Sequence, residues 1–137
     1  MSTQKQNEYL LLFRGKAWYN SLSAEQLQKA MTDFNSWFEC LSEQGKVKAA
    51  QPLGREGKMV SGSRGRIVSD GPFVESKEAI GGYFLIAADS LDDAVAIAKS
   101  CPGLEYGTQV EVRPVAEECP MLERARQLLS AEQLAAA

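Results

Sequence analysis

Tyr9-Leu10-Leu11-Leu12-Phe13 is a continuous apolar run near the start of the chain. Such a run is typical of an interior strand whose two faces are both covered. A second run, Gly82-Tyr83-Phe84-Leu85-Ile86-Ala87-Ala88, has the same character. The two runs therefore predict two interior strands of one sheet.

A long amphipathic helix is predicted between these runs. Ser23 and Gln26 form a capping-box pattern, because the hydroxyl and the side-chain amide can each satisfy an unpaired N–H of the first helical turn. Gly45 supplies a stop. The apolar residues between them recur at three- and four-residue steps, so one face must pack on a sheet. These residues are Leu27, Ala30, Met31, Phe34, Trp37, Phe38 and Leu41.

A second helix is predicted after the second run. Ser90 and Asp93 repeat the cap pattern, and Cys101-Pro102-Gly103 ends the helix. Its short apolar face consists of Leu91, Ala94, Val95, Ile97 and Ala98. Thr108 to Val115 then alternates between apolar and polar residues, which predicts a half-exposed strand that Pro114 limits or ends.

Shorter elements are predicted elsewhere. Strand-compatible patches occupy residues 47–50, 59–60 and 66–68, and Gly62-Ser63-Arg64-Gly65 between the last two favours a hairpin turn. Apolar residues at helical steps predict a last helix from Pro120 to about Leu134, which would cover a sheet edge or a partner.

The order of these elements predicts an α+β, ferredoxin-like βαββαβ domain with an extra C-terminal helix. We expect residues 1–8 to be a flexible N-terminus, residues 9–115 to form the domain and residues 116–137 to form the helical extension. Two helices can cover only one face of the sheet. We therefore expect a homodimer that packs through the open sheet face into an α/β-barrel.

Composition narrows the classes of function. The formal charge of −3 disfavours direct nucleic-acid binding, and no window approaches the roughly 18 apolar residues that cross a bilayer. We expect a cytoplasmic protein of bacterial type. The chain has no histidine, which excludes catalysis by Ser-His-Asp or Cys-His groups and imidazole-based metal sites, and we expect neither a metal nor a cofactor. Cys40, Cys101 and Cys119 form no CxxC pair and are interpreted as free thiols, with Cys119 the most exposed.

The segment Asp70-Gly71-Pro72-Phe73 stands before a charged stretch, Glu75 to Glu78, and the double glycine Gly81-Gly82. With Asp92-Asp93-Ala94, Pro102, Gly107 and Glu111-Val112-Arg113-Pro114, this pattern resembles the YCII-related family, and within it the branch named for its DGPF motif. The resemblance covers about Tyr9 to Val115 and implies a dimeric α+β barrel.

The resemblance implies less about chemistry. Most family members have no assigned activity, although some branches carry a His paired with an acidic residue as a proposed acid–base couple, and related folds include lactone isomerases. Without histidine, only the acidic member remains here, and Asp70 is the candidate. An isomerase- or lyase-like enzyme is one hypothesis. Other relatives of the branch are associated with alternative sigma factors, which suggests a non-catalytic regulatory or accessory dimer.

Two interpretations of Asp70 stay open. Asp70-Gly71-Pro72 is also a typical turn, and Phe73 then fills the core. If Asp70 instead serves a site, the family's cavities between the sheet and the first helix imply that it converges with other polar residues on a small anionic or oxygenated ligand. The expected ligand-binding residues are Arg14, Ser61, Arg66, Phe73 and Lys77, with Trp18 and Tyr19 at the rim of the pocket. Gly81-Gly82 permits close approach of a ligand or of a neighbouring strand.

Overall fold

The computed structural model describes residues 7–15, 17–71 and 79–136. Its main sheet has the strand order β2-β5-β1-β6, and all three neighbouring pairs are antiparallel. These strands are β1 (Asn7–Arg14), β2 (Val47–Pro52), β5 (Ile80–Ala88) and β6 (Gln109–Pro114). The two apolar runs thus form the two central strands, as predicted. The arrangement is α+β and consistent with a ferredoxin-like fold.

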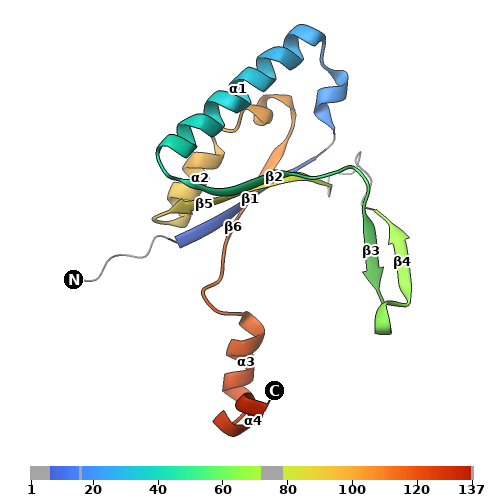
Figure 1. Ribbon diagram of the computed structural model, residues 1–137, viewed down its shortest axis with the longest axis vertical. Coiled ribbons are helices and arrows are strands. Elements are labelled where there is room, and N and C mark those ends of the chain that lie inside the picture. The colour runs from blue at the N-terminus through green and yellow to red at the C-terminus, as the bar shows by residue number, and fades with distance from the viewer. Residues whose placement is uncertain (1–6, 16, 72–78, 137) are drawn as a thin grey trace, which may run out of the picture.

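Helices α1 (Ala24–Glu43) and α2 (Leu91–Ala98) pack on one face of this sheet (Figure 1). Both predicted caps are present: Ser23 Oγ accepts from Gln26 N–H, and Ser90 Oγ accepts from Asp93 N–H. Gly45 follows α1 with a φ of 70°, a left-handed conformation that glycine adopts without strain. The sequence therefore predicted both helices and their ends.

The core lies between this sheet face and the two helices. Leu11 and Ile86 are completely buried on the central strands, and Trp37 and Leu41 meet them from α1. Met31, predicted to lie on the buried face of α1, is instead 58 % exposed. The adjacent Ala30 is only 1 % exposed, so Met31 lies outside the packed face of α1, because successive residues of a helix point about 100° apart.

The other sheet face carries the cross-strand pairs Leu10–Leu85 and Leu12–Tyr83. These alternate with the pair Leu11–Phe84 on the core side, because successive side chains of a strand point to opposite faces. We call this surface the open face. In the part of the chain that the structure describes, both helices that pack on the sheet lie on the opposite side.

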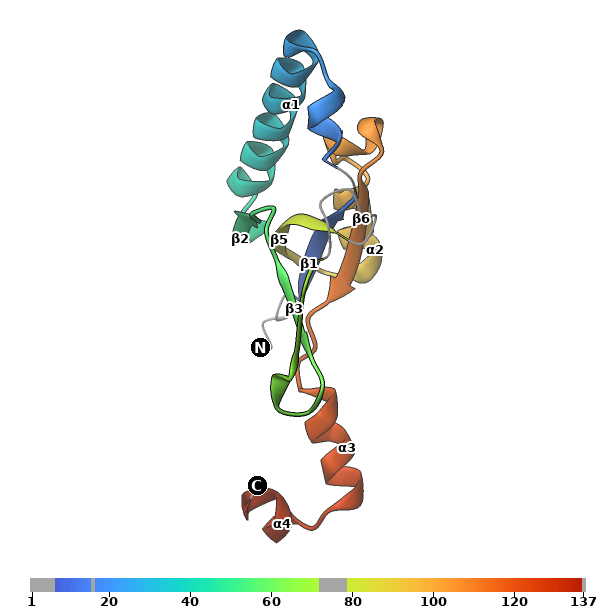
Figure 2. The ribbon, with the colours of Figure 1, turned by 90° about the vertical axis from the view of Figure 1, so that its right-hand side faces the viewer.

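Strands β3 (Lys58–Ser61) and β4 (Ile67–Asp70) form a separate two-stranded sheet, here called the ribbon (residues 58–70). Its turn contains a short 3₁₀ segment, η2 (Ser63–Gly65), and Gly62 and Gly65 both have positive φ, so the predicted hairpin turn is confirmed. The ribbon projects away from the main sheet (Figures 1 and 2).

The C-terminal residues 116–136, here called the tail, form α3 (Pro120–Leu128) and α4 (Ala131–Ala136). The prediction of one helix to Leu134 was therefore wrong. Ser130 explains the break, because its backbone N–H donates to Gln133 Oε1 at 2.8 Å and its hydroxyl accepts from Gln133 N–H at 3.3 Å. This capping box starts a second helix. Among the described helices, none is long and apolar enough to cross a membrane.

Candidate functional site

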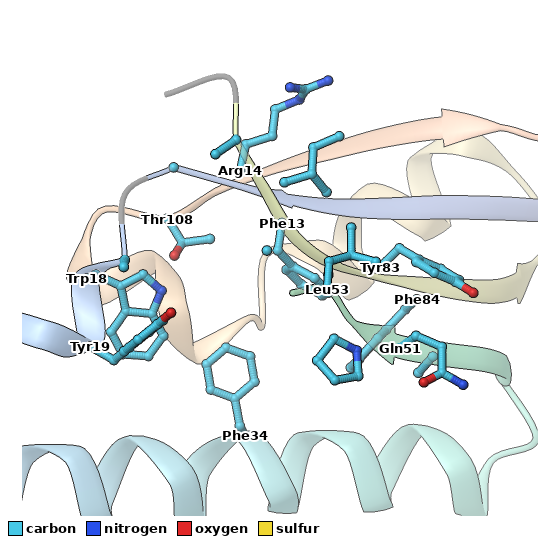
Figure 3. A pocket seen from close by; sticks show the side chains of 18 of the residues that line it. Phe13, Arg14, Trp18, Tyr19, Phe34, Gln51, Leu53, Tyr83, Phe84 and Thr108 are labelled. Carbon is cyan, nitrogen blue, oxygen red and sulfur yellow. The ribbon is translucent and has the colours of Figure 1, made fainter. Parts of the chain in front are cut away.

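A cavity of about 480 Å³ lies between α1, the 3₁₀ turn η1 (Trp18–Ser21) and the ends of β1, β2 and β5 (Figure 3). Phe34 and Phe38 reach it from α1, and Trp18 and Tyr19 from η1. Leu53 to Arg55, the loop after β2, completes the rim. The predicted role of Trp18 and Tyr19 at a pocket rim is therefore consistent with the structure. The size is typical of sites for small molecules.

Aromatic rings form one wall of the cavity. Trp18 stacks between Phe34 and Tyr106, with ring centroids 6.0 Å and 4.9 Å away and planes within 13° of parallel. Tyr19 meets Trp18 edge-on at 5.8 Å. A stack of this kind holds η1 in place and leaves flat apolar surface toward the cavity.

The floor is formed by the sheet. Phe13 meets Phe84 edge-on at 5.0 Å, and Phe84 in turn contacts Phe38 at 5.5 Å. Gly82 also belongs to this floor. β2 passes so close to it that a Cβ atom at Gly82 would lie 3.0 Å from the Gln51 carbonyl oxygen. A Cβ atom at Gly81 would find its nearest neighbour at 3.9 Å. Close approach of a strand thus accounts for Gly82, whereas Gly81 leaves space on the cavity wall.

Polar groups are few and stand at separate points of the wall. The Arg55 guanidinium lies over the Tyr19 ring, 5.5 Å from its centroid, and so joins the loop after β2 to η1 across the rim. Thr108 is 93 % buried and presents its side chain on the same side as Trp18 (Figure 3). Gln51 adds an amide at the edge strand. An apolar cavity with a few polar groups is the usual form of a small-molecule site.

Arg14 also lines the cavity, at the end of β1. Its Nε donates to Glu111 Oε1 on β6 at 2.5 Å, and both side chains are about 30 % exposed. Figure 3 shows the guanidinium pointing away from Phe34, toward the open face. Arg14 therefore joins the cavity edge to β6 through this ion pair.

Comparison with known proteins identifies the family. The model of the YCII-related domain matches residues 8–121. The chain belongs to the YCII-related family. An uncharacterised protein of Rhizobium meliloti (strain 1021) is 30 % identical over 111 residues, an alignment that covers 78 % of this chain and 90 % of the relative.

The YCII-related chain places the predicted site residues in two regions. Arg14 lies at the cavity, whereas Ser61, Arg66 and Asp70 lie on the exposed ribbon. Asp70 forms an ion pair with Lys58, and the two side chains are 69 % and 68 % exposed. Phe73 and Lys77 lie outside the described residues. The expected convergence of Arg14, Ser61, Arg66 and Asp70 on one ligand is therefore not present in the structure.

Sequence reasoning missed other residues of the cavity. Phe34 and Phe38 were assigned to the helix face that packs on the sheet, and Arg55 belongs in sequence to a group of basic residues with Lys58 and the ribbon arginines. Both assignments describe the chain locally, and neither indicates that α1 and the loop after β2 meet. The one usable signal was the Trp18-Tyr19 pair, which lies outside any helical or strand periodicity.

The three thiols are free, as predicted. Cys119, the thiol singled out as the most exposed, is exposed, and Cys40 is exposed as well. Cys101 is buried against the core, and burial raises the pKa of its thiol, an effect that hydrogen bonds from the backbone of Gly103 and Leu104 partly offset. None of the three lines the aromatic cavity.

Proposed function

We propose that this YCII-related protein binds a small, flat, largely apolar molecule in the aromatic cavity, with an anionic or oxygenated group of that molecule at the rim. The single observation that carries this proposal is the convergence of Trp18, Phe34 and Phe84 on one cavity of about 480 Å³. These side chains come from η1, α1 and β5. Exposed aromatic surface of this kind favours a ligand with a planar apolar ring.

The charge at the rim favours an anion. Two arginines belong to the described lining. Arg55 lies over the Tyr19 ring, whereas the guanidinium of Arg14 points away from Phe34. A guanidinium can donate two parallel hydrogen bonds to a carboxylate or a sulfonate. Thr108 and Gln51 offer further hydrogen bonds to oxygen atoms on the ligand.

The lining favours binding over proton transfer. Among the described residues of the cavity wall, none carries a carboxylate, a thiol or an ammonium group. Catalysis by Asp70 remains a prediction of the sequence, and its position on the ribbon gives it no part in this proposal. An Asp70→Asn variant that loses ligand binding would restore Asp70 to the site, and unchanged binding is the result we expect.

The location of the site can be tested with 8-anilinonaphthalene-1-sulfonate, an aromatic anion whose fluorescence rises on binding. Ala50 lies on β2 and lines the cavity, whereas its neighbour Ala49 is exposed and lies outside the described lining. We expect Ala50→Phe to weaken dye binding by about tenfold or more, because it fills the cavity, and Ala49→Phe to leave it unchanged. Equal binding by parent and Ala50→Phe would overturn the proposal.

The role of charge has its own matched pair. Arg55→Gln removes the cation at the rim, and Arg64→Gln removes one from the ribbon turn. We expect Arg55→Gln alone to weaken the dye by about fivefold to tenfold, because a hydrogen bond to a charged group contributes about 1.5–3 kcal/mol when buried and less at a rim. Equal losses in both variants would indicate attraction to overall charge and no defined anion site.

We also propose that the protein works as a homodimer that packs open face against open face. The pairs Leu10–Leu85 and Leu12–Tyr83 give this face an apolar centre, and Glu111 and Arg113 add charge toward β6. A symmetric dimer is the commonest way to cover such a surface. Light scattering at micromolar concentration tests it, and a monomer would contradict it.

A further inference from the structure

Two segments of the chain leave the domain without covering it. The ribbon follows β2, and the tail follows β6, where Val115 N–H makes a last sheet hydrogen bond to the Glu8 carbonyl at 2.9 Å. Both project from the side of the sheet opposite to α1, and in Figure 1 they descend apart from each other. A second copy on the open face would occupy this same side.

The ribbon has too little packing of its own. Its apolar side chains are all more than half exposed: Met59, Val60, Ile67 and Val68. An isolated two-stranded sheet is marginally stable in water unless a further strand or a helix packs on it. Among the described elements, none covers the ribbon.

The tail has the complementary deficiency. α3 has nine residues and no buried residue, and among the described elements it packs substantially only on α4. Helices shorter than about 12–15 residues are marginal in water by themselves. Its unpacked apolar side chains gather at helical spacing, with Met121 78 % and Leu128 64 % exposed. α3 is thus an amphipathic helix that lacks a surface to cover.

The charges of the two segments are opposite. The ribbon carries Lys58, Arg64 and Arg66 against a single carboxylate, a net charge of +2. The tail carries four glutamates against two arginines, a net charge of −2. The glutamates are Glu117, Glu118, Glu123 and Glu132. Complementary charge on two apolar surfaces fixes which surfaces meet.

We propose that the tail of each protomer docks on the ribbon of its partner in the homodimer. The inference rests on the proposed open-face dimer, because the ribbon and the tail both project from that side of the sheet. Two-fold symmetry forms the contact twice, because each copy offers one ribbon and one tail. The ribbon gains the helix that stabilises it, and the tail gains an apolar surface.

A charge exchange tests the pairing. Arg64→Asp with Arg66→Glu turns the ribbon from +2 to −2, and Glu123→Lys with Glu132→Lys turns the tail from −2 to +2. Asp is compatible with the positive φ of residue 64. Replacing Glu123 and Glu132 breaks no ion pair among the described residues. We expect each pair alone to weaken the dimer about tenfold at low ionic strength, and all four together to restore it to within about threefold of the parent.

A cross-link tests directly whether the tail of one copy lies near the ribbon of the other. This test also works if the open faces alone hold the dimer so tightly that the charge changes do not weaken it. One copy carries Val60→Cys with Cys40→Ser and Cys119→Ser; the other keeps Cys119 and carries Cys40→Ser. A short bismaleimide should join the mixed copies through position 60 and Cys119, which lies at the start of α3. The matched control places Ser36→Cys on the exposed side of α1 and should give no product.

The outcomes distinguish a failure of the tail–ribbon contact from a failure of the proposed dimer. A monomeric parent overturns the open-face dimer and the exchange together. Two results together would overturn the exchange and leave the dimer in place. The first is a four-fold variant whose loss of dimer affinity equals the losses of the two double variants multiplied together. The second is the absence of a cross-link through position 60. A third variant, with Val60→Cys and Cys40→Ser but with Cys119 kept, carries both thiols in one copy. A cross-link within single copies of this variant would place the tail on its own ribbon and would also overturn the exchange.

Discussion

The cavity and the ribbon use similar side chains in opposite ways. Both bring apolar groups together with arginine, yet the cavity collects them from β1, η1, α1, β2 and β5, whereas the ribbon is one hairpin of 13 residues. The ribbon ends at Asp70, the first residue of the segment by which the sequence resembles its family. The cavity contains the surfaces suited to a ligand. Within the pattern that resembles the family, Asp70 thus lies on the ribbon, whereas Gly81 and Gly82 line the cavity.

Ion pairs in the two regions show the same contrast. Arg14 and Glu111 are 29 % and 32 % exposed beside the cavity, and Lys58 and Asp70 are more than two thirds exposed on the ribbon. Water screens the second pair far more strongly than the first. Substitutions in matched pairs test this difference between the packed cavity and the projecting ribbon.

The largest expected difference is in packing. Leu11 is completely buried under the helices, and Val68 on the ribbon is 59 % exposed. In the monomer, where no partner's tail covers the ribbon, we expect Leu11→Ala to lower the free energy of unfolding by about 3 kcal/mol and Val68→Ala by under about 1 kcal/mol. Urea unfolding followed by circular dichroism measures both. Similar losses at the two sites would mean that the ribbon is as tightly packed as the core.

The next effect lies within the cavity itself. Gly82→Ala would press a methyl group against the Gln51 carbonyl, whereas Gly81→Ala meets no atom closer than 3.9 Å. We expect the first to destabilise the fold by about 1–2 kcal/mol and the second by under about 0.5 kcal/mol. Thermal unfolding of both variants checks this. If Gly81→Ala is the more damaging, the glycine required by strand packing has been assigned to the wrong position.

A smaller effect separates the two ion pairs. We expect Glu111→Gln to cost about 1 kcal/mol and Asp70→Asn under about 0.5 kcal/mol, because the first pair is partly shielded from water. Raising the salt concentration should reduce the first loss only slightly. Unfolding curves at low and high salt provide the measurement. A larger loss at Asp70 would show that the ribbon pair is covered in the assembled protein.

Much of the fold was predictable because it depends on local signals. Ser23 with Gln26, Ser90 with Asp93 and the glycine turn of the ribbon each act within a few residues of sequence. The break at Ser130 was missed although Ser130 with Gln133 has the same spacing as Ser23 with Gln26. The repeated apolar steps through Leu128, Leu129 and Leu134 favoured one long helix over the cap signal.

The site was less predictable because it depends on where separate elements meet. Trp18 could be placed at a pocket rim, since its ring fits no periodic pattern. Phe34 and Arg55 could not, because one belongs to an amphipathic helix and the other to a run of basic residues, and either context explains them fully. The cavity exists because α1, η1 and the loop after β2 meet at the ends of the strands, and such a relation between elements leaves no mark in a local sequence window.

The smallest expected effect concerns the thiols. Burial raises the pKa of Cys101, so the unfolded chain loses that proton at a lower pH than the folded protein does. This contribution to stability is complete below the unfolded pKa of about 8.5 and is lost as the pH rises through the higher folded value. We expect the parent to lose more stability than Cys101→Ala between pH 7 and pH 10. Urea unfolding across this range measures the difference, and parallel pH profiles would show that burial does not hold the proton on the Cys101 thiol.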